Sequence, residues 1–179
     1  MEMMFLPLKR YADFMGRSRR REYWLWFLFQ VILALVFGII RKAAGDQNAQ
    51  AVQAVNSLVN LGLLIPTIAV SVRRFHDINR TGWWYVFPLV VFLVSLVLFL
   101  VLSSANLMTI FQQISQAGQH PTPDQSMAIL QSLAPLGWVF FAWWLASLVT
   151  FVFHVMDGTA GPNRFGPDPK GRGGNINVF

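Results

Sequence analysis

The chain has 179 residues, of which 55% are hydrophobic and only 12% are charged. A soluble domain of this length usually carries about 25% charged residues, so most of this chain's surface must face something other than water. The sequence holds no cysteine, which excludes disulfide bonds and thiolate chemistry. The net charge of +6 would suit nucleic-acid binding, but the positions of the charges favour another explanation.

Four segments free of Asp, Glu, Lys and Arg are apolar enough to be membrane spans. They are residues 23–40, 57–72, 83–105 and 133–156. The first segment, if helical, rises roughly 27 Å, close to the roughly 30 Å hydrocarbon core of a bilayer. The second is the weakest because Asn60 and Pro66 interrupt it, and a re-entrant or interfacial segment is its alternative. The sequence therefore predicts an all-α membrane protein, a small bundle of four transmembrane helices.

Basic residues fall almost entirely on one side of this four-pass arrangement. Twelve of the fourteen Lys and Arg residues precede the first segment, separate the second from the third, or follow the fourth. Loops rich in positive charge stay in the cytoplasm, so both termini are predicted to be cytoplasmic. The same side carries six of the eight carboxylates, which places the whole excess of +6 at the inner face. Membrane topology thus explains the high pI without nucleic acid.

These assignments divide the chain into three parts. They are a basic cytoplasmic segment over 1–22, the transmembrane domain over 23–156 with an outer loop at 106–132, and a Gly- and Pro-rich cytoplasmic tail over 157–179. Within the outer loop, Thr122-Pro123-Asp124-Gln125 has the pattern of a capping box with proline at the first helical position, which predicts a helix start. The helix of the fourth segment is expected to end at Gly158, since glycine commonly follows a helix.

The first of three charged motifs runs from Phe14 to Trp24, directly into the first segment. Its candidate residues are Arg17, Arg20 and Glu22. A basic lead-in of this kind orients a first span and places an aromatic residue at headgroup level. It also suits anionic lipid, at roughly 1 kcal/mol for each basic residue near the surface. Both interpretations stay open.

The second motif, from Arg73 to Trp84, connects the second and third segments. Its candidate residues are Arg73, Arg74, His76, Asp77 and Arg80. If the second helix continues to Asp77, Arg73 lies four residues earlier on the same face and is a candidate ion-pair partner, with Arg80 as a second. The interpretations are a hairpin held by ion pairs, a ligand or catalytic site, and a docking surface for a partner.

The third motif, from Asp157 to Pro169, contains the candidate residues Asp157, Asn163 and Arg164. It either folds back over the inner face or leaves the membrane as a soluble tail. A metal site built from His76, Asp77, His154 and Asp157 is conceivable. However, metal-dependent hydrolysis needs three or more ligands, and the third histidine, His120, lies on the opposite side. We therefore predict no metal and no cofactor.

Three sequence patterns occur in a fixed order. They are Gly-Arg-x-x-Arg-x-Glu-Tyr-Trp, Arg-Arg-x-His-Asp-x-x-Arg-x-Gly-Trp-Trp and Gly-x-Asn-Arg-Phe-Gly-Pro-Asp-Pro. Together they resemble the YhaH-like bacterial inner-membrane family, a domain-of-unknown-function family. The resemblance runs from Phe14 to about Lys170, and the chain departs from it in an outer loop, Asn106–Ser132, that is longer than expected. The resemblance implies a small polytopic protein of the bacterial inner membrane and no particular chemistry.

We expect the three motifs to meet at the inner rim of the bundle. The resulting cluster would close the bundle and bind an anionic lipid headgroup or a partner protein, which includes a second copy of the chain. No charged residue lies inside a predicted span, which argues against a self-contained proton-coupled transporter. Transport or channel activity stays as the alternative, along a polar line of Gln30, Asn60, Ser95, Ser147 and Thr150. The third hypothesis is an enzyme that acts on lipid headgroups through His76 or His154.

Overall fold

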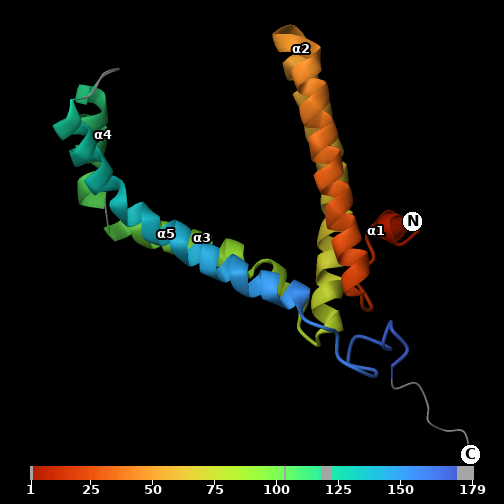
Figure 1. Cartoon of the computed structure of the whole chain (residues 1–179). Coiled ribbons are helices and arrows are strands. Elements are labelled where there is room, and N and C mark those ends of the chain that lie inside the picture. The colour runs from red at the N-terminus through yellow and green to blue at the C-terminus, as the bar shows by residue number, and fades with distance from the viewer. Residues whose placement is uncertain (1, 103, 118–121, 173–179) are drawn as a thin grey trace, which may run out of the picture. The chain divides into compact units, whose positions relative to one another are not determined.

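The computed structural model describes residues 2–102, 104–117 and 122–172 (Figure 1). The helices are α1 (Glu2–Lys9), α2 (Arg20–Asp77), α3 (Phe87–Leu102), α4 (Ser104–Ala117) and α5 (Pro123–Val155), with a short 3-10 helix η1 (Gly82–Tyr85) between α2 and α3. The described residues form no strand beyond one isolated bridge between Asn163 and Gly166. The fold is therefore all-helical, as the sequence predicts. The chain divides into two compact units, Met1–Tyr85 with Val152–Phe179, and Val86–Phe151.

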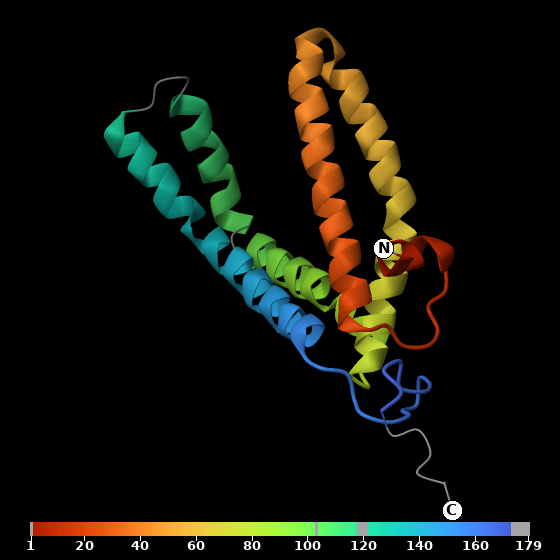
Figure 2. The same ribbon diagram turned by 45° about the vertical axis from the view of Figure 1, so that its right-hand side comes forward.

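Helix α2 is a hairpin of two helical limbs. A straight helix of its 58 residues would be about 87 Å long. At Gly45 the backbone leaves the helical region, with φ 68° and ψ 172°, and the chain reverses there (Figure 2). We call residues 20–44 the first limb and residues 46–77 the second limb. Two of the predicted spans, 23–40 and 57–72, lie on these two limbs.

The limbs run antiparallel and are joined by side chains. The indole Nε1 of Trp26 and the amide of Gln30 both donate to the Thr67 hydroxyl, at 3.1 and 2.6 Å. Trp26, Ala69 and Val70 are buried in the same region. Gln30 therefore bonds between the two limbs. The Asn60 amide instead donates to Asn56, one turn earlier on its own limb.

Helix α1 packs against this hairpin. The rings of Phe5 and Phe29 lie 5.5 Å apart, edge to face. The Tyr11 hydroxyl, just after α1, donates to the carbonyl oxygen of Gly62 on the second limb. Pro7 is fully buried, whereas Met3, Phe5 and Leu8 are exposed. The basic N-terminal segment thus contains a helix with one face on the hairpin and apolar side chains on its outside.

The second unit is built from α3, α4 and most of α5. The ring of Phe92 in α3 contacts Phe140 and Trp143 of α5, at centroid distances of 6.2 and 6.3 Å. Between α4 and α5, the Ser132 hydroxyl lies 3.3 Å from the side-chain oxygen of Gln113. The capping box is confirmed: the Thr122 amide donates to Gln125 Oε1, and the Gln125 amide donates to Thr122 Oγ1. In the predicted outer loop, residues 118–121 lie outside the described residues.

Much of the apolar surface is exposed. Helices α2 and α5 are long and apolar enough to cross a membrane, by length and composition, and α3 is a shorter apolar helix. Only 6% and 11% of the most apolar windows of α2 and α5 are buried, so these are not the covered core helices of a soluble protein. Exposed side chains such as Leu35, Ile39, Leu98 and Trp138 require an apolar surrounding.

Helix α5 ends at Val155, so the predicted end at Gly158 is wrong by three residues. The reason lies in the carbonyl groups of the last turn. The guanidinium group of Arg74 donates to the carbonyl oxygens of His154, at 3.2 Å, and of Met156. A helix that continued would need these carbonyls for its own backbone bonds. The amide of Gly158 instead donates to the side chain of Asp157, at 2.9 Å.

The turn at Gly45 can be tested by substitution. Its φ and ψ lie in a region that is essentially restricted to glycine, so Gly45→Ala should lower the free energy of unfolding by about 1–3 kcal/mol. Gly38→Ala is the matched control, because Gly38 is helical and nothing lies within 4 Å of the added carbon. Thermal unfolding in detergent measures both. Equal losses in the two variants would contradict a special role for the turn.

Candidate functional site

Arg17 brings the three charged motifs together within the first compact unit. Its Nε donates to the Asp77 carboxylate at 2.9 Å. Its Nη1 and Nη2 donate to the carbonyl oxygens of Gly161, at 2.7 Å, and Thr159, at 2.6 Å. The side chain is almost fully buried. One guanidinium group from the first motif therefore ties the end of α2 to the tail.

Asp77 is the common acceptor of two arginines. Its Oδ1 faces Arg17, and its Oδ2 accepts from Nη1 of Arg74 at 2.8 Å. The expected pairing of Asp77 with Arg73 or Arg80 is wrong. Arg74, one turn before Asp77 on the same helix, takes the place expected for Arg73, and it also binds the end of α5. The Asp77 carboxylate is thus held between two buried guanidinium groups.

Arg73 pairs instead with Glu22 of the first limb, at 3.2 Å. Its Nη1 also donates to the carbonyl oxygens of Asp13 and Arg10, so it holds the chain that connects α1 to α2. The side chain of Arg73 is fully buried and that of Glu22 almost so. We call Arg17, Glu22, Arg73, Arg74 and Asp77 the arginine cluster. Removing one member of such a buried pair leaves an uncompensated charge, which is strongly destabilising.

The tail up to Arg172 folds back onto the end of α2. The Asn163 amide donates to the carbonyl oxygen of His76 at 2.9 Å, and the Thr159 backbone amide donates to that of Asp77 at 2.9 Å. The ring of Phe165 stacks on His76, with centroids 3.9 Å apart. Of the two alternatives for this motif, the described tail follows the folded-back one.

Gly158 permits the close approach of the tail to Asp77. A side-chain carbon at position 158 would overlap the Asp77 carboxylate. The Asp77 backbone carbonyl accepts from both the amide and the hydroxyl of Thr159, at 2.9 and 3.2 Å. A glycine is therefore required here for its small size, whereas its role in ending a helix is taken by earlier residues.

A second group of ion pairs surrounds Asp157, whose side chain is exposed, and Asp168, whose side chain is buried. Asp157 faces Arg20, Lys170 and Arg172. The hydrogen bond from Lys170 lowers the pKa of Asp157 to about 2. The backbone amide of Lys170 and the side chain of Arg172 lower the pKa of Asp168 to about 2 as well. Both carboxylates are therefore charged at neutral pH and hold the tail in its folded form.

Two predicted site residues lie at the edge of this arrangement. Arg80 is exposed, and its guanidinium group lies over the rings of Trp84 and Phe153, at 5.7 and 5.6 Å. Arg164 is also exposed and lies over Phe165, at 4.7 Å. Neither has a carboxylate partner among the described residues. The structure thus contains two kinds of arginine: buried ones that are paired with carboxylates, and exposed ones whose charge no carboxylate of the described residues neutralises.

Sequence reasoning missed several residues that complete the site. Thr159, Asp168 and Arg172 contact the cluster or the tail directly. Asp168 and Arg172 are four residues apart, but that spacing indicates a contact only in a helix, and the tail is irregular. The sequence offered one signal, for Asp168. This carboxylate lies between Pro167 and Pro169, and proline restricts the backbone on either side of it.

The histidines of the enzyme hypothesis are packed among other groups. His76 Nδ1 lies 3.1 Å from the Gly16 carbonyl oxygen. The ring of His154 lies 4.2 Å from that of Tyr23 and 4.7 Å from that of Phe75. In the described residues no group of three His, Cys, Asp or Glu side chains is placed to hold a metal ion. The hydroxyls of Ser95, Ser147 and Thr150, part of the polar line for transport, donate to carbonyls of their own helices.

The arrangement defines a class: an all-helical protein with long exposed apolar helices and a buried arginine cluster at one end. The chain belongs to the family described as "Protein of unknown function (DUF805)", whose model matches residues 11–167. This confirms the resemblance to YhaH-like proteins that the three motifs indicate.

Two relatives match almost the whole chain. "Inner membrane protein YhaH" of Escherichia coli (strain K12) is 28% identical over 95% of this chain and 98% of the relative. "Inner membrane protein YhaI" of the same strain is 26% identical over 95% of this chain and 97% of the relative. "Uncharacterized protein YiiR" is 36% identical over 40% of this chain and 46% of the relative. No solved structure matches the chain. The names of the first two support an inner-membrane location for this protein.

The buried cluster makes a quantitative prediction. Arg17→Gln should lower the free energy of unfolding by about 3–5 kcal/mol, because it leaves Asp77 buried with one partner fewer. Arg10→Gln is the control. It removes the exposed pair with Asp13, whose side chains are 33% and 41% exposed, and should cost about 0–1 kcal/mol. Equilibrium unfolding in mixed micelles measures both, and similar values for the two variants would refute a structural role for the cluster.

Proposed function

We propose that the protein crosses the inner membrane four times with both termini in the cytoplasm. The spans are 23–40, 57–72, 83–105 and 133–156. Three observations support this proposal. Basic residues gather on one side of the four segments. The first two segments lie on antiparallel limbs joined by a glycine turn. The relatives that match nearly the whole chain are named inner membrane proteins.

The natural absence of cysteine makes the topology directly testable. Gln47→Cys, next to the turn of α2, should react with a membrane-impermeant maleimide in intact spheroplasts. Thr81→Cys, after the second limb, should react only after the membrane is permeabilised. Both positions are exposed. Reaction of Thr81→Cys from the outside would show that 57–72 is re-entrant, and the four-span proposal would fail.

We further propose that the cytoplasmic side of this protein binds anionic lipid headgroups of the inner leaflet. The observation that carries this proposal is the division of the charges. The arginine cluster and the pairs around it occupy most carboxylates of the proposed cytoplasmic side, while five cations of that side have no carboxylate partner among the described residues. These cations are Lys9, Arg19, Arg21, Arg80 and Arg164. Each would contribute about 1 kcal/mol near an anionic surface.

In this proposal the two sets of arginines have different tasks. The buried set is held by carboxylates and carbonyl groups, with Nε of Arg73 left without a hydrogen-bond partner among the described residues, and it serves as a scaffold. It fixes the ends of α2, α5 and the tail, and the exposed set is held on that scaffold. Arg80 lies on Trp84, an aromatic ring of the kind found at membrane interfaces. Recognition would then depend on the exposed charges, and removing them should leave the fold intact.

Lipid enrichment tests this function. The protein is reconstituted in nanodiscs from equal parts phosphatidylglycerol and phosphatidylethanolamine, and tightly retained lipids are measured by mass spectrometry after delipidation. The double variant Arg80→Gln/Arg164→Gln should retain less phosphatidylglycerol than the native chain. The control Arg41→Gln/Lys42→Gln removes two charges from the proposed outer side and should retain the native amount. If both variants behave alike, charge on the cytoplasmic side has no special role.

A further inference from the structure

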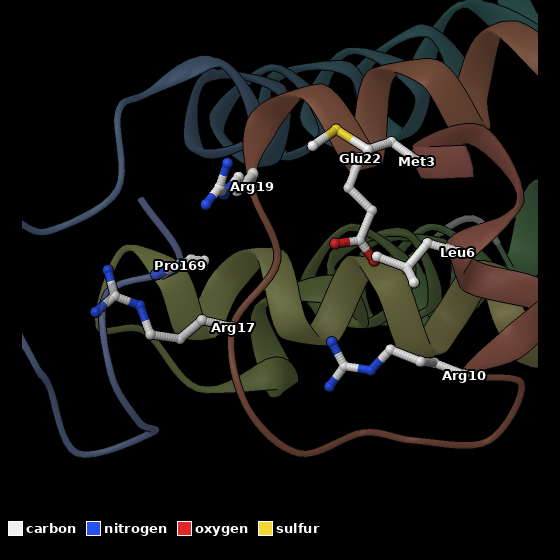
Figure 3. A pocket seen from close by; sticks show the side chains of 7 residues that line it. All are labelled: Met3, Leu6, Arg10, Arg17, Arg19, Glu22 and Pro169. Atoms are coloured by element: carbon white, nitrogen blue, oxygen red, sulfur yellow. The ribbon is translucent and has the colours of Figure 1, made fainter. Parts of the chain in front are cut away.

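A pocket of about 270 Å³ lies between α1 and the start of α2 (Figure 3). We call it the α1 pocket. Met3 and Leu6 of α1 line one end, and Arg17, Arg19 and Pro169 line the other. Glu22 and Arg10 also line it. The pocket therefore joins an apolar end on the N-terminal helix to a basic end beside the arginine cluster.

Most charges that line the pocket are already compensated. Arg17 is paired with Asp77, and Arg10 with Asp13. Glu22 is paired with Arg73, which lies behind it. Arg19 differs, because its side chain makes no ion pair and no hydrogen bond with the described residues. The pocket thus presents one unsatisfied guanidinium group, which suits an anion and disfavours a cation.

The apolar end indicates what kind of anion fits. Met3 is 36% exposed, and the neighbouring Phe5 and Leu8 are exposed on the same helix. Helix α1 packs against Phe29 on the first limb, and Tyr11, just after it, bonds to Gly62 on the second, both in segments proposed to lie in the bilayer. A free phosphate would gain nothing from such an apolar wall. An amphipathic molecule would bury its apolar part there and keep its charge on the arginine.

The size of the pocket limits the part that enters it. Pockets that enclose a drug-sized ligand measure about 300–1,000 Å³. The α1 pocket, at about 270 Å³, lies just below the lower end of this range. A phosphodiester with its glycerol therefore fits, while long acyl chains must stay outside. In this arrangement the acyl chains would lie along α1, which packs against the segments proposed as spans.

We propose that the α1 pocket binds the phosphodiester of one anionic glycerophospholipid, with the phosphate on Arg19 and the glycerol end against Met3 and Leu6. This rests on the proposed function, since it requires the pocket to face the inner leaflet. It adds a defined site with a stoichiometry of one lipid. Arg19 donates to the phosphate oxygens, and the saturated side chain of Arg17 forms the wall behind them. General attraction to exposed charges would produce no such stoichiometry.

Native mass spectrometry of the full chain in detergent tests this site, with dioctanoyl phosphatidylglycerol as the probe. The native protein should bind one lipid. Arg19→Gln should weaken this binding at least about tenfold, the value of one charge-assisted hydrogen bond. Arg21→Gln is the matched control, because Arg21 is exposed, equally without a partner, and outside the pocket. It should change binding less than about twofold.

A second pair of variants tests the apolar end. Leu6→Trp should fill the pocket and abolish the single bound lipid, whereas Leu8→Trp, on the exposed side of α1, should not. Arg19→Gln removes no ion pair with the described residues, so it stays informative if Leu6→Trp fails to fold. Glycerol 1-phosphate and inorganic phosphate should not bind at the concentration at which dioctanoyl phosphatidylglycerol saturates the protein. If either binds as tightly as the lipid, the pocket is a site for soluble phosphate and the lipid proposal is overturned.

The test separates this proposal from the general one. Equal weakening by Arg19→Gln and Arg21→Gln would overturn the pocket while leaving attraction by exposed charges in place. A second outcome is a single bound lipid that is lost in Arg19→Gln, together with lipid enrichment that is unchanged in Arg80→Gln/Arg164→Gln. This outcome would support the pocket and contradict recognition by the wider surface.

Discussion

The buried ion pair between Arg17 and Asp77 is the interaction on which the first compact unit depends. Burying a carboxylate costs several kcal/mol unless excellent partners surround it. Asp77 obtains two guanidinium groups, one from its own helix and one from a segment 60 residues earlier. Arg17 in turn needs acceptors for its remaining donors and finds them in the carbonyls of the tail. Once this pair is buried, three segments far apart in the sequence must meet.

The same constraint determines where charge is left over. Arg73 and Arg74 are fully buried and bound to Glu22, Asp77 and nearby carbonyl groups, so they are not accessible to a ligand. The cations without a carboxylate partner among the described residues lie elsewhere, at the half-buried Arg19 and at exposed positions such as Arg21. A motif that looks like a site is thus mainly a scaffold, and the recognition that we propose belongs to residues beside it. The α1 pocket is the place where a free guanidinium group meets an apolar wall.

Apolar surface and polar bonding are separated along the hairpin. Near Asp77 the limbs are joined by the ion pair between Glu22 and Arg73, and farther along Trp26 and Gln30 of the first limb donate to Thr67 of the second. Hydrogen bonds between helices need no charge, so they suit a segment that faces hydrocarbon. The outer faces carry exposed Leu, Ile and Val. The first unit holds few buried apolar residues, and this exposed apolar surface suits the inner-membrane location that the names of the relatives support.

The sequence by itself determined the helical class, the family, the start of α5 and the gathering of charge near three short motifs. These follow from local rules: apolar length, capping residues and composition act over a few neighbouring positions. Only the tertiary structure decided which charges pair. Spacing favoured Arg73 for Asp77, but Arg73 turns toward Glu22 on the other limb, and Asp77 pairs with Arg74 and with the distant Arg17. The role of Gly158 as a space for Asp77, the fold of the tail and the α1 pocket likewise depend on contacts between residues more than 20 positions apart, which no local pattern encodes.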